Sequence, residues 1–281
     1  MAEFTAKDVA ALRKATGAGM MDCKKALEET DGDIEAAKDW LRAQGITKAD
    51  KRAGRAAEQG AIDVAVEGRA GAVVELTCET DFVAKGADFR ALVTALAHQV
   101  AEQGDTDVEA QPFEGGTVGD AVQALGAKLG ENVGLGRVTR YETADGLLDA
   151  YKHIQNERGT IGVLVELGGV DPTDPKARAV AHDVALHVAS AGPRYASRDD
   201  VPAEVVAHER SVLEELTRNE GKPDQAIPKI VEGRLNAFYK DQVLVEQPFI
   251  REPKTTVGKL VESLGADATV RRFVRFKIGE E

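Results

Sequence analysis

The hydrophobic pattern of this chain changes its period between residues 62 and 100. Residues 62–66 alternate apolar with polar or small side chains, residues 68–71 predict a turn, and residues 73–78 predict a second strand, so this segment indicates a β-hairpin. Apolar side chains then recur at helical spacing, at Phe89, Leu92, Leu96 and Val100. Asp88 is the candidate N-cap of this helix. A strand pair followed directly by a helix favours an α+β fold.

Phe82 lies in the connection between this hairpin and this helix, within residues 79–86. An aromatic side chain held there by a rigid scaffold could anchor a partner protein, because a few large side chains carry most of the energy of many interfaces. The alternative is that Phe82 folds back into the core of its own chain. Spacing alone leaves both interpretations open.

Residues 1–45 predict a small module of three short helices. Thr5 and Asp8 have the spacing of a capping box at the start of the first helix, and glycines in residues 16–19 and 31–32 end the first and second helices. A polar stretch follows, with a basic cluster at Lys48, Lys51, Arg52 and Arg55. We interpret this stretch as a solvated tether, and a nucleic-acid site as the weaker alternative.

The chain after residue 117 continues the mixture of helices and strands. A helix is predicted at residues 118–129, β-like segments near 133–141, 147–152 and 161–167, a helix at 175–190, and a final strand at 270–278. Strands and helices that segregate in this way favour antiparallel sheets covered by helices.

Two apolar helices joined at residues 219–223 predict a helical hairpin. The first carries Val205, Val212 and Leu216 on its apolar face, and Pro228 places the start of the second at or just before that residue. The apolar side chains of the second helix are Ile227, Ile230, Val231, Leu235 and Phe238. A projecting coiled coil and a packed helix pair both need such a stripe, so the sequence does not separate them.

The charge and the cysteine content exclude other classes. The net charge of −12 at pH 7 disfavours a broad phosphate-binding surface. No apolar run approaches about 18 residues and the first residues lack the layout of a signal peptide, so we expect no membrane span and a cytoplasmic location. Cys23 and Cys78 are too few for a disulfide scaffold or a CxxC metal site.

Motifs of enzyme active sites are also missing from the sequence. Residues 130–136 contain glycines but no following Lys-Ser/Thr, and neither HExxH nor Gly-x-Ser-x-Gly occurs. We therefore expect no cofactor, no metal and no catalytic residues. Four histidines are interpreted as hydrogen-bonded structural side chains, namely His98, His182, His187 and His208.

Two longer motifs carry a resemblance to a known family. Residues 16–27 (TGAGMMDCKKAL) together with residues 80–85 (TDFVAK) closely resemble bacterial elongation factor Ts, the nucleotide-exchange factor for the translation GTPase elongation factor Tu. Shorter matches follow in consistent order at residues 129–132, 187–190, 231–235 and 247–249. The resemblance runs from about residue 1 to residue 281.

The resemblance implies a division of the chain. A ubiquitin-associated-like three-helix domain is expected at residues 1–46, a linker at 47–60, and an N-terminal core subdomain at 61–141. The C-terminal core subdomain is expected at residues 142–281, with the helical hairpin at 202–240 inserted as a short antiparallel coiled coil. The implied fold class is α+β with antiparallel sheets.

The resemblance also implies a mechanism. The protein would bind elongation factor Tu with GDP, displace Mg²⁺, and perturb the phosphate loop so that GDP leaves and GTP can bind. Phe82 would be the wedge within Thr80, Asp81, Phe82 and Val83, with Asp81 supporting it by polar contacts. Leu129 and Gly130 would form a second contact near the phosphate-loop helix of the partner.

Further contacts are implied for three other residues. His153 would meet a β-barrel domain of the partner, although residues 155–157 look longer than the usual pattern. Lys24 and Lys25 would contact the GTPase domain. A homodimer through the helical hairpin is a further expectation, whereas direct contact with nucleic acid or membrane is not expected.

Two other function classes compete with nucleotide exchange. A chaperone-like adaptor of a GTPase would stabilise its partner without changing nucleotide release. A hydrolase that uses clustered carboxylates has only the surplus of Asp and Glu in its favour, and acidic surfaces are usually solvated.

Overall fold

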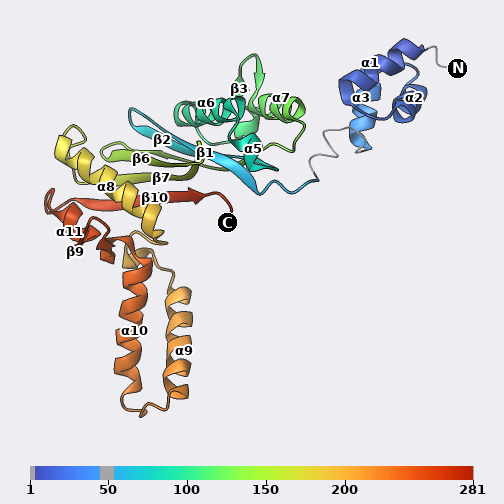
Figure 1. Cartoon of the computed structure of the whole chain (residues 1–281). Coiled ribbons are helices and arrows are strands. Elements are labelled where there is room, and N and C mark those ends of the chain that lie inside the picture. Colours follow the sequence, from blue (N-terminus) through green and yellow to red (C-terminus); the bar gives the residue numbers. More distant parts are fainter. Residues whose placement is uncertain (1–3, 45–53, 281) are drawn as a thin grey trace. The chain divides into compact units, whose positions relative to one another are not determined.

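The computed structural model describes residues 4–44 and 54–280. The helices are α1 (Ala6–Thr16), α2 (Met20–Glu29), α3 (Ile34–Ala43), α5 (Asp81–Ala84), α6 (Ala87–Gln103), α7 (Val118–Leu129), α8 (Pro175–Ala191), α9 (Ala203–Asn219), α10 (Ile227–Gln242) and α11 (Val257–Glu262). The strands are β1 (Gln59–Glu67), β2 (Ala70–Cys78), β3 (Pro112–Phe113), β4 (Gly116–Thr117), β5 (Gly134–Glu142), β6 (Leu147–Gln155), β7 (Arg158–Gly168), β8 (Pro248–Phe249), β9 (Glu252–Thr256) and β10 (Thr269–Lys277) (Figure 1). The chain is mixed helix and strand, as predicted.

The chain forms two compact units. One comprises Met1–Ala61, Leu76–Leu92 and Asp107–Gly136, and the other comprises Ile62–Glu75, Val93–Thr106 and Arg137–Glu281. Most of the predicted tether, including Lys48, Lys51 and Arg52, lies outside the described residues.

The N-terminal module is a three-helix bundle with its own core. Leu12, Cys23 and Leu27 are fully buried between α1, α2 and α3. The capping box predicted at the start of α1 is confirmed, because Asp8 Oδ2 lies 2.7 Å from both the backbone nitrogen and Oγ1 of Thr5. Burial raises the pKa of the Cys23 thiol, as expected for a cysteine that packs as a small apolar residue.

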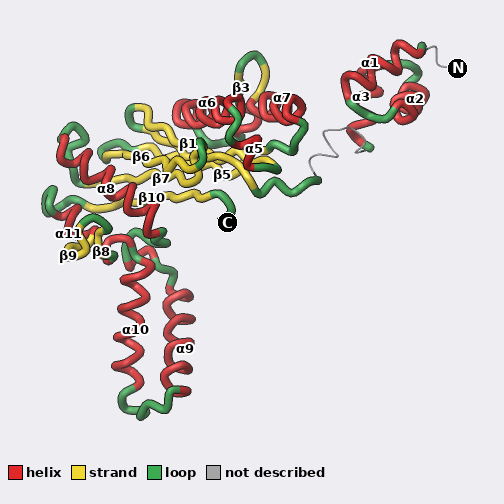
Figure 2. The backbone as a smooth tube through the Cα atoms, viewed as in Figure 1, coloured by secondary structure: helices red, strands yellow, loops and turns green. Residues whose placement is uncertain are grey.

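The longer strands, drawn in yellow in Figure 2, form two three-stranded sheets in the orders β1-β2-β5 and β10-β7-β6. The short strands form two two-stranded sheets, β3-β4 and β8-β9. β7 pairs antiparallel with both of its neighbours. α6 follows the first hairpin as predicted, but it begins at Ala87, so the predicted N-cap at Asp88 is wrong. Asp88 instead lies in the first turn of the helix, and its carboxylate pairs with Lys128 Nζ at 2.6 Å.

Apolar residues of the two sheets pack against each other. Ile62 and Val73 form one cluster with Leu148, Leu164 and Phe276. A Cβ atom on Gly162 of β7 would lie 2.4 Å from Ile62 Cγ2, so the packing of the Ile62 side chain against β7 requires glycine. α8 packs on β6 and β7, and its buried valines join a separate core cluster.

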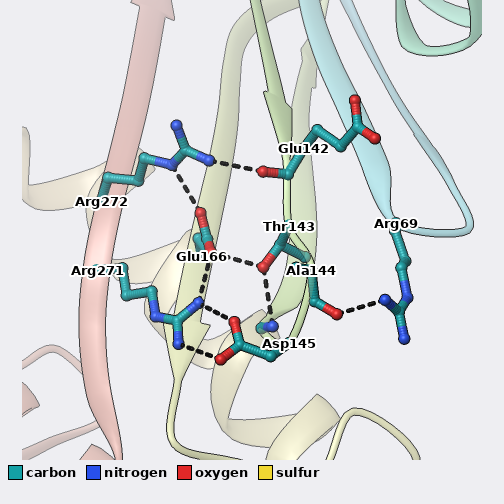
Figure 3. A network of polar contacts seen from close by, with 9 residues as sticks. Arg69, Glu142, Thr143, Ala144, Asp145, Glu166, Arg271 and Arg272 are labelled. Carbon is teal, nitrogen blue, oxygen red and sulfur yellow. Dashed lines mark hydrogen bonds and ion pairs between the residues drawn. The ribbon is translucent and has the colours of Figure 1, made fainter.

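A buried carboxylate on β7 connects the neighbouring strand β10 with the loop between β5 and β6 (Figure 3). Glu166 of β7 is only 3% exposed, and it accepts hydrogen bonds from Thr143 Oγ1 at 2.7 Å and from Arg272 Nε at 2.6 Å. Arg271 Nη1 lies 3.2 Å from Glu166 Oε1 and also pairs with Asp145. Burial alone would raise the pKa of Glu166, but the hydrogen bonds from Thr143 and the two arginines outweigh it and lower that pKa.

α9 and α10 run side by side as a helical hairpin (Figure 1). α10 begins at Ile227, which confirms the start predicted from Pro228. The predicted stripe on α9 is wrong in part, because Val212 and Leu216 are 46% and 47% exposed whereas Thr217 is fully buried. The Thr217 hydroxyl donates to Leu213 O at 2.6 Å, so this polar side chain enters the seam already hydrogen-bonded.

A buried histidine joins α8 to the chain that follows the hairpin. His187 is 1% exposed, and its Nε2 lies 2.9 Å from Oε1 of Gln247. The backbone N–H of Ile250 donates to His187 Nδ1 at 3.3 Å, so Nε2 carries the proton that Gln247 accepts. The interpretation of His187 as a hydrogen-bonded structural side chain is confirmed.

Candidate functional site

Phe82 stands on the surface, on a single helical turn between β2 and α6. Its side chain is 83% exposed, so the interpretation in which it folds back into its own core is wrong. Thr80 caps this turn through a hydrogen bond that its Oγ1 accepts from Val83 N at 3.3 Å. Asp81 and Lys85 form an ion pair of 2.5 Å across the turn. A large apolar side chain is thus presented to solvent by a locally ordered backbone.

Two carboxylates fix this turn to the segment that follows α7. Glu131 Oε2 accepts hydrogen bonds from the backbone N–H groups of Glu79 and Thr80, both at 3.1 Å, and its Oε1 accepts from Thr80 Oγ1 at 2.6 Å. In return, Glu79 Oε1 accepts from the backbone N–H of Asn132 at 2.6 Å and pairs with Arg55 at 3.1 Å. We call Glu79, Thr80, Glu131 and Asn132 the carboxylate clamp.

Leu129 and Gly130 end α7 directly before the clamp. Gly130 is the C-cap, with a φ of 77° in the left-handed region, and its N–H donates to Gly126 O at 2.9 Å. Glycine adopts this conformation without strain, and it turns the chain so that Glu131 reaches the loop before Phe82. The structure therefore brings the two predicted contact segments, residues 80–83 and 129–130, to one region.

His153 lies near the end of β6, opposite Ile161 of β7. Its ring is exposed, and its Nδ1 lies 3.2 Å from the hydroxyl of Tyr151. Next to it is a groove of about 360 Å³, lined by Tyr151, His153, Ile161, Leu186, Ala189, Ser190, Ile250, Arg275 and Lys277. Its lining combines apolar side chains with two basic ones, Arg275 and Lys277.

Lys24 and Lys25 are exposed on α2 of the N-terminal module. Lys24 borders an apolar pocket of about 370 Å³ that Phe4, Val9, Met20 and Met21 help to line. Lys25 Nζ instead lies 5.8 Å from the centre of the Trp40 ring, at cation–π distance. The two neighbouring lysines therefore differ in what they contact.

Sequence reasoning missed the residues that hold the site together. Glu79 and Glu131 were not predicted as site residues, although each lies within or beside a motif that carries the family resemblance. Their spacing of 52 residues in sequence gave no signal that they face each other.

Within the described ranges, no group of three or more His, Cys, Asp or Glu side chains is arranged to hold a metal ion. No helix among the described residues is both long and apolar enough to span a bilayer.

Comparison with known proteins matches nearly the whole chain to one family. The family model "Elongation factor TS" matches residues 79–280, and "Elongation factor Ts, mitochondrial, N-terminal" matches residues 2–49. The chain belongs to the elongation factor Ts family. Elongation factor Ts of Micrococcus luteus is 47% identical over 284 residues, covering 99% of this chain and 100% of the relative. Elongation factor Ts of Thermobifida fusca is 46% identical over 285 residues, covering 100% of both chains.

Family membership confirms the resemblance that the motifs of residues 16–27 and 80–85 indicate. It implies that the protein is a translation elongation factor with a nucleotide-exchange function toward elongation factor Tu. It also favours exchange over hydrolysis, because nucleotide exchange is the function that membership of this family implies.

Proposed function

We propose that this protein releases GDP from elongation factor Tu by inserting Phe82 into the GTPase domain of that partner. The observation that carries the proposal is the 83% exposure of Phe82 on a turn that the carboxylate clamp holds in place. Leaving a Phe side chain in water costs about 1.5–3 kcal/mol relative to burial, and binding a partner recovers this free energy. A backbone turn that is already fixed in its presenting conformation loses little entropy when it binds.

The partner's Mg²⁺ site and phosphate loop are the proposed targets. Mg²⁺ requires nearly octahedral coordination at short distances, so a small displacement of its ligands weakens nucleotide binding strongly. Asp81 would contribute polar contacts beside Phe82, while Leu129 and Gly130 would approach the phosphate-loop helix. By linkage, an exchange protein that binds nucleotide-free elongation factor Tu more tightly than the GDP-bound form must weaken GDP binding in the same ratio.

Further contacts would hold the partner while GDP leaves. His153 would bind its β-barrel domain, and Lys24 and Lys25 would bind its GTPase domain. These contacts are needed because an exchange factor must compete with a nucleotide whose nanomolar affinity corresponds to about 12 kcal/mol. We propose the GDP-bound and nucleotide-free forms of elongation factor Tu as the states that this protein binds.

The test is release of a fluorescent GDP analogue from elongation factor Tu in a stopped-flow instrument. Catalytic amounts of the wild-type protein should accelerate GDP release. Phe82→Ala should reduce that acceleration about tenfold or more, which corresponds to about 1.4 kcal/mol of transition-state stabilisation. Leu216→Ala is the matched control, because it also removes an exposed apolar side chain but lies on the helical hairpin.

The outcomes separate the proposal from an adaptor function. Phe82→Ala should unfold at the same temperature as the wild type, since its side chain contributes little to the core. Binding of elongation factor Tu without faster release would favour the adaptor, and full activity of Phe82→Ala would remove Phe82 from the mechanism.

A further inference from the structure

Four side chains between β6 and α8 form a continuous row that ends at His153. Asp149, Tyr151 and His153 occupy alternate positions of β6 and therefore project from the same face of the sheet. His182 of α8 contacts two members of this row, so this face lies toward α8. The row contains three titratable ring side chains. None of them takes part in the Thr80 cap of α5 or in the carboxylate clamp.

The row is fixed from its half-buried end at Asp149 outward. Asp149 Oδ1 lies 3.0 Å from His182 Nδ1, and the ring of His182 meets the Tyr151 ring edge-on at 6.0 Å between centroids. Burial raises the pKa of Asp149, and the hydrogen bond with His182 partly offsets that effect. The Tyr151 ring also packs against the core cluster beneath α8. The hydroxyl of Tyr151 is therefore held at a defined point beside the surface.

That hydroxyl is the described polar partner of the His153 ring. Tyr151 Oη lies 3.2 Å from His153 Nδ1, and the two rings are stacked at 30° with their centroids 6.3 Å apart. An O–H donated to Nδ1 leaves the single proton of the neutral imidazole on Nε2. His153 then offers a hydrogen-bond donor to a partner instead of an acceptor.

We infer that Tyr151 is a positioning residue that orients His153 and fixes its Nε2–H tautomer, so that His153 donates a hydrogen bond to a carbonyl or carboxylate oxygen of elongation factor Tu. This inference rests on the proposed function. A single exposed histidine could rotate about its side-chain bonds, and ordering it only on binding would reduce affinity. Tyr151 removes this cost because its own ring is held by packing.

The experiment is a double-mutant cycle on the full chain with nucleotide-free elongation factor Tu. Tyr151→Phe keeps the ring and its contact with His182 but removes the hydroxyl. We expect it to raise the Kd of the complex by about three- to tenfold, the range of one net hydrogen bond, and to change the Kd by less than about 1.5-fold when His153 is already alanine. Tyr239→Phe is the matched control, because it also removes one tyrosine hydroxyl but from a ring outside this row. That ring stacks on Arg198 at the base of the hairpin.

A second readout needs no partner. In ¹⁵N-labelled free protein, Tyr151→Phe should shift the His153 Nδ1 resonance and leave that of His187 unchanged. An unchanged His153 resonance, or an equal loss of affinity with and without His153, would overturn the inference and leave the proposed function standing. If His153→Ala binds with unchanged Kd, the His153 contact of the proposed function fails, and the inference fails with it.

Discussion

The Glu131 carboxylate binds both the side-chain hydroxyl and the backbone N–H of Thr80. The two carboxylate oxygens of Glu131 accept from Thr80 Oγ1 at 2.6 Å and from Thr80 N at 3.1 Å. Hydrogen bonds to an ionised acceptor are roughly twice as strong as neutral ones. The position of Phe82, two residues beyond Thr80, therefore depends on a residue from a distant part of the chain.

Replacing Glu131 with alanine should release the turn that carries Phe82. We expect the acceleration of GDP release to fall about tenfold, because the loss of preorganisation lowers binding of the transition state. The free energy of unfolding should fall by only about 1–3 kcal/mol, as for other lost charged hydrogen bonds. Glu102→Ala on the exposed side of α6 is the matched control, and equal exchange rates for the two variants would contradict the role of the clamp.

Glu166 should make stability depend on pH at the acidic end. Its pKa is lowered in the folded protein, so its contribution is fully present above the ordinary carboxylate value of about 4.5 and is lost as pH falls through the lowered value. Glu166→Ala should cost about 1–3 kcal/mol at pH 7, since its arginine partners stay partly solvated. Urea unfolding followed by far-UV circular dichroism at pH 7 and pH 4 measures both effects.

The N-terminal module supplies an internal reference for that experiment. Trp40 of α3 is the single tryptophan of the chain, so tryptophan fluorescence reports on the three-helix module. We expect Glu166→Ala to leave the fluorescence transition unchanged. A parallel shift of both signals would show that the substitution acts on the whole chain.

His187 should add a second pH dependence at milder acidity. Burial lowers its pKa, and the hydrogen bond to Gln247 opposes this shift only in part. Its contribution is therefore fully present above about 6.5, the ordinary histidine value, and decreases as pH falls toward the lowered folded value. His187→Leu should be less stable than the wild type at pH 7.5 and should lose less stability between pH 7.5 and pH 5.5. Thermal unfolding at both pH values checks this, and an identical loss in both proteins would argue against His187.

The helical hairpin should tolerate changes on one flank of α9 and not at its seam. Leu235 is 2% exposed, so Leu235→Ala should cost about 2–5 kcal/mol through the cavity it leaves. Leu216→Ser, at a position that is 47% exposed, should change stability by less than about 0.5 kcal/mol. Chemical denaturation followed by circular dichroism measures both, and a comparable loss in Leu216→Ser would mean that Leu216 is covered in solution.

The N-cap of α3 offers a local test of the module. Asp33 Oδ1 accepts hydrogen bonds from the backbone N–H groups of Glu35 at 2.9 Å and Ala36 at 3.1 Å. Asp33→Ala should destabilise the module by about 0.5–2 kcal/mol, whereas Asp33→Ser should retain most of the cap. Trp40 fluorescence during urea unfolding is the measurement, and an equal loss in both variants would exclude the cap as the cause.

Local signals in the sequence were sufficient for the elements themselves. The two-residue period at 62–66, the helical period from Phe89, the capping box at Thr5 and the constraint at Pro228 all act within a few residues, and the structure confirms the elements that they predict. The error at Asp88 is of the same local kind, because the helix begins at Ala87, two residues before the start at Phe89 that an N-cap at Asp88 requires. The family resemblance likewise depends on short runs of residues.

Long-range packing decided which side chains are buried, which are exposed and which of them meet. An apolar stripe on α9 predicts a buried face, but the contact with α10 selects Thr217 for the seam and leaves Val212 and Leu216 exposed. The exposure of Phe82 could not be read from its spacing, since an aromatic residue can either complete a core or stand outside it. Glu131 and Thr80 are 51 residues apart, and only the folded chain places that carboxylate on that turn. Periodicity and caps are short-range properties of the backbone, whereas the choice of which side chains meet depends on the packing of the whole domain.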